Sequence, residues 1–200
     1  MDDGKKAALV KKRLVVGMSG ASGAILGIEL LKALKNNTEW ETHLVVSRGA
    51  RETIARETDY SLDEVSDLTN KVYYYDDVWG NIASGTFRTE GMVIVPCSMK
   101  TVAGVANGYS DNLLLRAADV TIKEGRKLVI APRECPLSTV HLRNLLMLSE
   151  LGVVIVPPML SYYNDPHSVE DMTKHIVGKI LDKFEIELDE FRRWGEVSDD

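Results

Sequence analysis

The chain has 200 residues, of which 44% are apolar and 27% charged, with a formal net charge of −6. These values are ordinary for a globular protein, and we expect one domain built around one buried core. An acidic chain has no general attraction for nucleic acid or an anionic lipid surface, so neither is an expected partner. The two cysteines, Cys97 and Cys135, form no CxxC pattern, which predicts a reducing, cytoplasmic compartment and no metal site.

Short apolar runs alternate with helical patterns along the chain. The runs predict strands at Leu14–Met18, His43–Val46, Met92–Pro96, Leu128–Ala131 and Val153–Val156. They are nearly continuous in apolar residues, as in strands that a parallel sheet buries on both faces. The last run continues to Leu160 but contains two prolines and is too short to cross a membrane.

The segments between these runs have the apolar periodicity of helices. It predicts helices over Ala24–Leu34, Leu137–Leu151 and Val169–Leu181, and the first of them would place Ile25, Ile28, Leu31 and Leu34 on one face. Residues 59–87 have a mixed pattern, which predicts a helix and an extra strand at Val72–Tyr75. Residues 1–12 are expected to form an N-terminal extension and residues 195–200 an acidic tail. Alternating strands and helices predict a three-layer α/β domain with a doubly wound parallel sheet.

Polar residues follow each predicted strand at the point where it ends. The segments are Ser19–Ala24, Ser47–Gly49, Cys97–Thr101, Arg133–Glu134 and Ser161–Asn164. Ligands of open parallel sheets bind beyond the carboxyl ends of the strands. Hydroxyls, cations and aromatic rings at these ends therefore predict a site for an anion attached to a flat ring.

The glycine-rich segment Gly17–Gly23 joins the first strand to the first helix. Small residues let the backbone approach a phosphate, and a helix N-terminus offers N–H groups and the positive end of its dipole. The segment matches neither the P-loop nor the GxGxxG spacing. Since the second strand ends in Ser47 and Arg48 and not in an acidic residue, a mononucleotide such as FMN fits better than a dinucleotide. The alternative is a tight turn without a ligand.

Other chemistries find little support. The GxSxG motif of a hydrolase nucleophile elbow is absent, and the four histidines lack the spacing of metal ligands. Asp76-Asp77 is not followed by the further acidic residue of a diphosphate–magnesium motif and is more typical of a surface turn. A phosphate would thus be held by cations. Arg116 lies in an apolar helical context that is typical of an Arg–Asp pair. Glu134 follows Arg133 directly after a buried strand, where an ionised glutamate could act as acid or base.

Five ordered motifs make the chain similar to a known family. They are Gly20-Ala21-Ser22-Gly23-Ala24, Pro96-Cys97-Ser98-Met99-Lys100-Thr101, Arg116-Ala117-Ala118-Asp119-Val120, the run from Leu128 to Pro136, and Ser138-Thr139-Val140-His141-Leu142. They resemble the UbiX/Pad-type flavin prenyltransferases, in the branch of the phenolic-acid decarboxylase B subunits. The resemblance extends from about residue 13 to Trp194.

This resemblance implies a Rossmann-like or flavodoxin-like fold in a homododecamer. It implies a metal-independent prenyltransferase that joins the dimethylallyl group of dimethylallyl monophosphate to N5 and C6 of reduced FMN, as a cofactor for a UbiD-type decarboxylase. It implies FMN contacts from Gly20, Ala21, Ser22, Ser47, Ser98, Met99, Lys100, Thr101, Arg116 and Arg133.

For the donor, the resemblance implies contacts from Glu57, Lys123, Tyr163 and Lys179, with Ser22, Glu134, Glu57 and Lys123 as the catalytic candidates. Trp194 would help to shelter the allylic cation. At Lys179 the family usually has arginine; lysine keeps the charge but loses the bidentate fork.

Two other functions remain open. An FMN-dependent cysteine-type decarboxylase would share the fold, but such enzymes carry a Pro-x-Met-Asn-type motif where this chain has Pro158-Met159-Leu160-Ser161. A non-catalytic flavin carrier, or subunit of an aromatic acid decarboxylase, would not need Lys123, Glu57 and Glu134 together.

Overall fold

The computed structural model describes residues 11–188, 191 and 193. Trp194, the predicted tail and most of the predicted extension lie outside these residues. Within them, six parallel strands form one sheet in the order β3-β2-β1-β4-β5-β6. The strands are β1 (Lys12–Met18), β2 (Trp40–Val46), β3 (Lys71–Tyr73), β4 (Gly91–Cys97), β5 (Lys127–Pro132) and β6 (Val154–Ile155).

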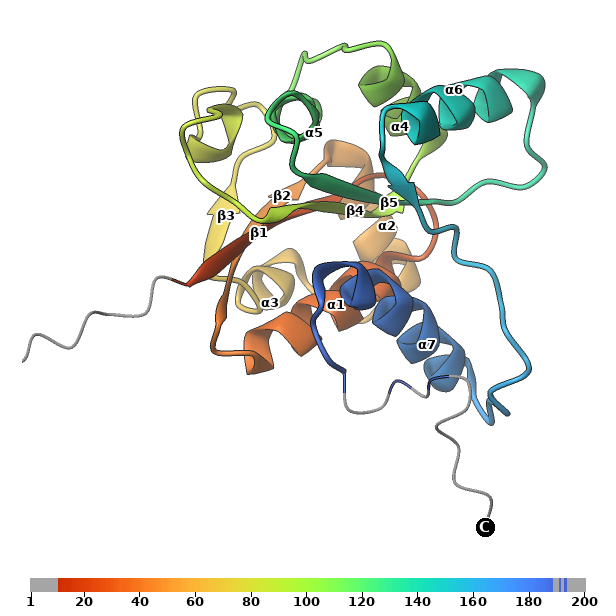
Figure 1. Cartoon of the computed structure of the whole chain (residues 1–200). Coiled ribbons are helices and arrows are strands. Elements are labelled where there is room, and N and C mark those ends of the chain that lie inside the picture. The colour runs from red at the N-terminus through yellow and green to blue at the C-terminus, as the bar shows by residue number, and fades with distance from the viewer. Residues whose placement is uncertain (1–10, 189–190, 192, 194–200) are drawn as a thin grey trace, which may run out of the picture.

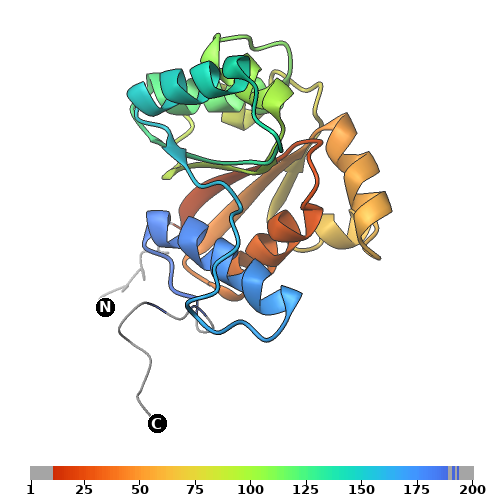
Figure 2. The same cartoon turned by 90° about the vertical axis from the view of Figure 1, so that its right-hand side faces the viewer.

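Helices cover both faces of this sheet, which gives three layers (Figure 1). On one face lie α1 (Ala24–Asn36), α2 (Arg48–Glu57), α3 (Leu62–Ser66) and α7 (Val169–Leu181). On the other lie α4 (Met99–Ala106), α5 (Leu113–Lys123) and α6 (Thr139–Glu150). Two short 3-10 turns, η1 (Asn81–Ala83) and η2 (Asp182–Phe184), complete the elements. The view turned by 90° shows the same two groups of helices above and below the sheet (Figure 2).

The strands are apolar on both faces because each face supports its own core. Every residue of β4 is buried, and the two hydrophobic clusters lie on opposite sides of the sheet. The predicted fold class is thus confirmed. The strand order is the 3-2-1-4-5-6 of the Rossmann fold and not the 2-1-3-4-5 of flavodoxin.

Two helices differ from their predicted burial. In α1, Leu26 and Leu30 are buried as well as the predicted face, and Ile25 is only partly buried. The buried face is wide because α1 packs against both the sheet and α7. In α6, Leu148 is the one buried residue, so most of its apolar face meets solvent. Among the described residues, no helix has the length and apolar character needed to span a membrane.

Candidate active site

The site lies where β1 and β4 are neighbours, because the chain winds outward from these two central strands in opposite directions. At such a switch point the loops that follow the two strands separate and leave a crevice. Ser19 joins the strand ends: its hydroxyl donates to the Pro96 carbonyl at 3.1 Å and accepts the Ser98 N–H at 2.7 Å. These bonds hold the glycine-rich loop beside the start of α4.

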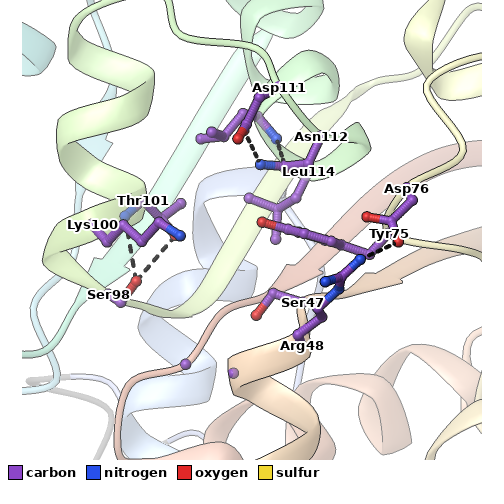
Figure 3. Close-up of a pocket in the computed structure, with 13 residues that line it drawn as sticks. Ser47, Arg48, Tyr75, Asp76, Ser98, Lys100, Thr101, Asp111, Asn112 and Leu114 are labelled. Atoms are coloured by element: carbon purple, nitrogen blue, oxygen red, sulfur yellow. Dashed lines mark hydrogen bonds and ion pairs between the residues drawn. The ribbon is translucent and has the colours of Figure 1, made fainter.

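A pocket of about 490 Å³ opens at this point (Figure 3). Its lining comes from the segments after β1, β2, β3 and β4 and from the start of α5. The lining residues are Gly20, Ser47, Arg48, Gly49, Tyr75, Asp76, Ser98, Lys100, Thr101, Asp111, Asn112, Leu114 and Leu115. Its volume is typical of a small-molecule site.

Three helices begin at this pocket, and each has a capping side chain. The Ser47 Oγ caps α2 by accepting the Ala50 N–H, Ser98 caps α4 and Asn112 caps α5. Each cap satisfies one of the amide donors that a helix N-terminus leaves without an intrahelical partner. In α2 and α4 the amides one residue before the capped ones are those of Gly49 and Lys100. Within the described part of the chain, neither has a hydrogen-bond partner.

The electrostatics of the pocket favour an anion. Two helix dipoles, those of α2 and α4, add their positive ends to the charges of Lys100 and Arg48. Lys100 is exposed, and Arg48 forms a solvent-exposed ion pair with Asp76 at 2.7 Å. The hydroxyls of Ser98 and Thr101 lie 3.1 Å apart. A phosphate monoester matches this set of donors and charges.

The glycine loop approaches α2 more closely than any side chain would allow. A Cβ added to Gly20 would lie 2.9 Å from the Gly49 Cα, and one added to Gly49 would lie 3.2 Å from the Gly20 Cα. The two facing glycines permit this approach of backbone to backbone, and a side chain at Gly20 would force one backbone to shift. They therefore set the distance between the first loop and the α2 amides.

An aromatic ring forms one wall of the pocket. Tyr75 follows β3, and its ring extends between Arg48 on one side and Leu114 on the other (Figure 3). Burial, with help from the carboxylates of Asp111 and Asp76, raises the pKa of Tyr75, so the phenol stays neutral. A neutral flat ring beside an anion cradle suits a flavin, whose ring can stack while its phosphate meets the helix N-termini.

The N-terminus of α1 is already occupied by a carboxylate. The Gly23 and Ala24 N–H groups donate to Glu57 Oε2 at 2.8 and 3.1 Å. Burial acts to raise the pKa of Glu57, but the Ser22 hydroxyl, these two amides and the charge of Arg133 outweigh it and hold that pKa below its ordinary value. In this structure Glu57 therefore occupies the position at the first helix that the sequence analysis predicted for a phosphate.

Ser22, Glu57 and Arg133 thus form a second cluster beside the pocket, two residues along the chain from Gly20. Arg133 and Glu134 are exposed and follow β5, and the Glu134 carboxylate accepts the Cys135 N–H at 3.0 Å. The sequence predicted that all the strand ends meet at one site, but the structure places them at two neighbouring sites. The ends of β1 to β4 surround the pocket, and the segment after β5 belongs to the neighbouring cluster.

Tyr163 and Lys179 lie at α7. Tyr163 is half-exposed in the segment before α7, and its hydroxyl lies 3.2 Å from His175 Nε2. Lys179 is exposed and lies one helical turn after His175. Neither residue lines the pocket.

Several predicted site residues are placed elsewhere. Arg116 forms the Arg–Asp pair that its helical context favours, with Asp119 at 2.6 Å, and it donates to the Ala83 carbonyl. Lys123 pairs with Glu124 at the end of α5, at the amino edge of the sheet opposite the pocket. Ala21 and Met99 are buried and do not line the pocket. Among the described residues, no three His, Cys, Asp or Glu side chains gather where they could hold a metal.

The sequence-based reasoning missed six pocket residues outside the strand-end segments, which are Tyr75, Asp76, Asp111, Asn112, Leu114 and Leu115. Asn112 had a local signal, because asparagine before an apolar helical run is typical of an N-cap. Tyr75 had none, since its position depends on the pairing of β3 with β2. FMN fits the residues present: Ser47, Ser98, Lys100 and Thr101 would hold its phosphate, and Tyr75 would contact its ring.

Comparisons with known proteins agree with this site. The sequence model of the flavoprotein family matches residues 4–184. The flavin prenyltransferase LpdB of Lactiplantibacillus plantarum is 52% identical over 183 residues, which cover 92% of this chain and 98% of that protein.

Two solved structures are similar throughout. AnUbiX, in complex with FMN and dimethylallyl pyrophosphate, has a TM-score of 0.91 at 45% identity and covers 92% of this chain and 98% of its own. A dodecameric FMN-dependent UbiX-like decarboxylase from Escherichia coli O157:H7 has a TM-score of 0.90 at 52% identity, over 91% and 98% of the two chains. The chain therefore belongs to the flavoprotein family and, within it, to the UbiX-like flavin prenyltransferases.

Proposed function

We propose that this protein transfers the dimethylallyl group of dimethylallyl monophosphate to N5 and C6 of reduced FMN. The observation that carries the proposal is the anion cradle made by the N-termini of α2 and α4 with Lys100, beside the Ser22–Glu57–Arg133 cluster. Reduced FMN supplies the nucleophilic atoms. The protein binds and orients both partners and stabilises the phosphate that leaves the donor.

The second cluster supports a monophosphate donor. Glu57 is ionised, so it can accept a proton or hydrogen bond from a phosphate that keeps one proton, while Arg133 supplies positive charge. Lys179 would add a second positive charge if the donor phosphate reaches α7. A diphosphate carries more charge and usually requires a metal, for which the described residues offer no carboxylate cluster. In this proposal Glu134, exposed beside Arg133, takes the proton that is lost when the new ring closes.

The proposed assembly is a homododecamer in which a second copy completes the site. The exposed apolar residues of α6, among them Val140, Leu142 and Leu146, need a cover, and the UbiX-like decarboxylase from Escherichia coli O157:H7 is dodecameric. Lys123 lies at the opposite edge of the sheet, so it can serve the reaction only from a neighbouring copy. Chains carrying Lys123→Ala and Glu134→Ala should each be inactive alone and regain activity after mixed reassembly; no recovery would place Lys123 outside the site.

An anaerobic incubation tests the proposed reaction. The protein is mixed with reduced FMN and either dimethylallyl monophosphate or the diphosphate, without magnesium, and the extracted flavin is analysed by mass spectrometry. We expect a gain of one prenyl unit with the monophosphate and none with oxidised FMN. Product from the diphosphate alone would overturn the donor assignment.

Unmodified FMN from protein that binds it would overturn the transferase. It would favour a flavin carrier, or a cysteine-type decarboxylase, which a peptide with a C-terminal cysteine would then reveal. We further propose that the product serves a UbiD-type decarboxylase in the cytoplasm. The extracted flavin should restore activity to an apo-decarboxylase of that type.

A further inference from the structure

A buried histidine lies in α7 next to the segment that carries Tyr163. His175 is 4% exposed and is surrounded in sequence by apolar residues such as Ile176 and Val177. A buried polar group costs free energy unless it forms a hydrogen bond. Its Nε2 lies 3.2 Å from the Tyr163 hydroxyl, while its Nδ1 has no hydrogen-bond partner among the described residues. The bond to Tyr163 therefore accounts for a histidine at this position.

Two aromatic rings fix the orientation of this imidazole. Tyr163 meets it edge to face, with the ring centroids 5.6 Å apart, and Phe191 lies against it at 5.4 Å. Gly178 makes room for Phe191, because a Cβ at Gly178 would collide with that ring. Burial, and then the charge of Lys179, lower the pKa of His175, so the imidazole stays neutral.

Tyr163 itself belongs to a segment without helix or strand. Residues 156–168 connect β6 to α7, and Tyr163 is 52% exposed although its hydroxyl reaches a buried nitrogen. One end of the side chain is thus anchored, while about half of the residue remains exposed to solvent. Lys179 lies four residues after His175 on the same helix, so α7 carries both the anchor of Tyr163 and a cation.

We propose that His175 is a positioning residue for the transfer reaction. Its imidazole holds the Tyr163 hydroxyl and thereby fixes the Tyr163 ring and the segment around it at the donor side of the site. This inference rests on the proposed function and on the donor contact that the family resemblance implies for Tyr163. His175 itself contacts Tyr163 and Phe191 and does not need to touch either substrate.

A double-mutant cycle tests the inference. His175→Phe keeps a flat ring but removes the hydrogen bond, and we expect it to raise the KM for dimethylallyl monophosphate roughly 3- to 10-fold while FMN affinity stays unchanged. In a Tyr163→Phe background the same substitution should have no further effect. His175→Gln has an amide that can replace Nε2, so its KM should lie close to the wild-type value. His167→Phe, a matched change at an exposed histidine nearby, should leave KM unchanged.

An equal effect of His175→Phe with and without the Tyr163 hydroxyl would overturn the inference. If the wild-type protein transfers no prenyl group, the proposed function fails, but the anchoring of Tyr163 by His175 can still be tested. Chymotrypsin cleaves after residues such as Tyr162, Tyr163 and Leu160, so its rate of cleavage reports how firmly this segment is held. His175→Phe should then be cleaved faster than wild type at an unchanged melting temperature, and His175→Gln at the wild-type rate. Equal cleavage of all three proteins would overturn the anchoring role.

Discussion

The close approach of Gly20 to Gly49 makes Gly20→Ala an informative substitution. The added Cβ would lie 2.9 Å from the Gly49 Cα and 3.0 Å from its carbonyl carbon. Both are backbone atoms, so they cannot rotate away as a flexible side chain could. The glycine loop and the N-terminus of α2 must move apart, and the amides of α2 then leave the phosphate position.

The magnitude follows from the contact that is lost. A hydrogen bond to a charged group contributes about 1.5–3 kcal/mol, and each 1.4 kcal/mol is a factor of ten in affinity. Loss of one amide contact to the FMN phosphate should therefore weaken FMN binding about 10- to 150-fold. Overpacking should also lower the free energy of unfolding by about 1–3 kcal/mol.

Quenching of flavin fluorescence on titration measures the affinity, and urea denaturation measures the stability. Gly125→Ala is the matched control. Gly125 has a φ of +65° and nothing within 4 Å of an added Cβ, so alanine there should cost about 1 kcal/mol of stability and leave FMN affinity unchanged. Wild-type affinity in Gly20→Ala would refute the assignment of the cradle.

Three further predictions concern charge. Lys100→Ala should weaken FMN binding about 3- to 10-fold, by an amount that shrinks with added salt, and a salt-independent loss in the same titration would contradict a phosphate contact. Lys179→Ala should raise the KM for the donor and leave FMN bound; an unchanged KM would remove Lys179 from the site. Burial lowers the pKa of His43, although the charge of Glu41 acts to raise it. Below about pH 6.5, therefore, the unfolded chain binds a proton at this histidine more readily than the native state does. Stability should fall as the pH drops below about 6.5, and His43→Phe should flatten that fall in urea midpoints; an equal slope in both proteins would refute it.

The sheet and most helices could be predicted from local pattern. Strands buried on both faces must be apolar throughout, and helices that cover them must show helical periodicity, so both leave a signal in a short window of sequence. The extra strand after residue 70 was predicted from a mixed pattern, and two of the three residues of β3 are exposed. The apolar residues of α6 were also visible, but a periodic pattern cannot tell a face buried in the same chain from one exposed on its surface.

The sequence by itself determined the fold class, the family and the strand ends that bear polar residues. Tertiary structure decided which of these ends meet. It placed Glu57, far along the chain, on the α1 amides, and left the α2 and α4 amides for the anion. It also placed Lys123 at the opposite edge of the sheet. The physical reason is that a helix N-terminus attracts any anion, a side chain or a ligand alike, and only the packed fold determines which one reaches it.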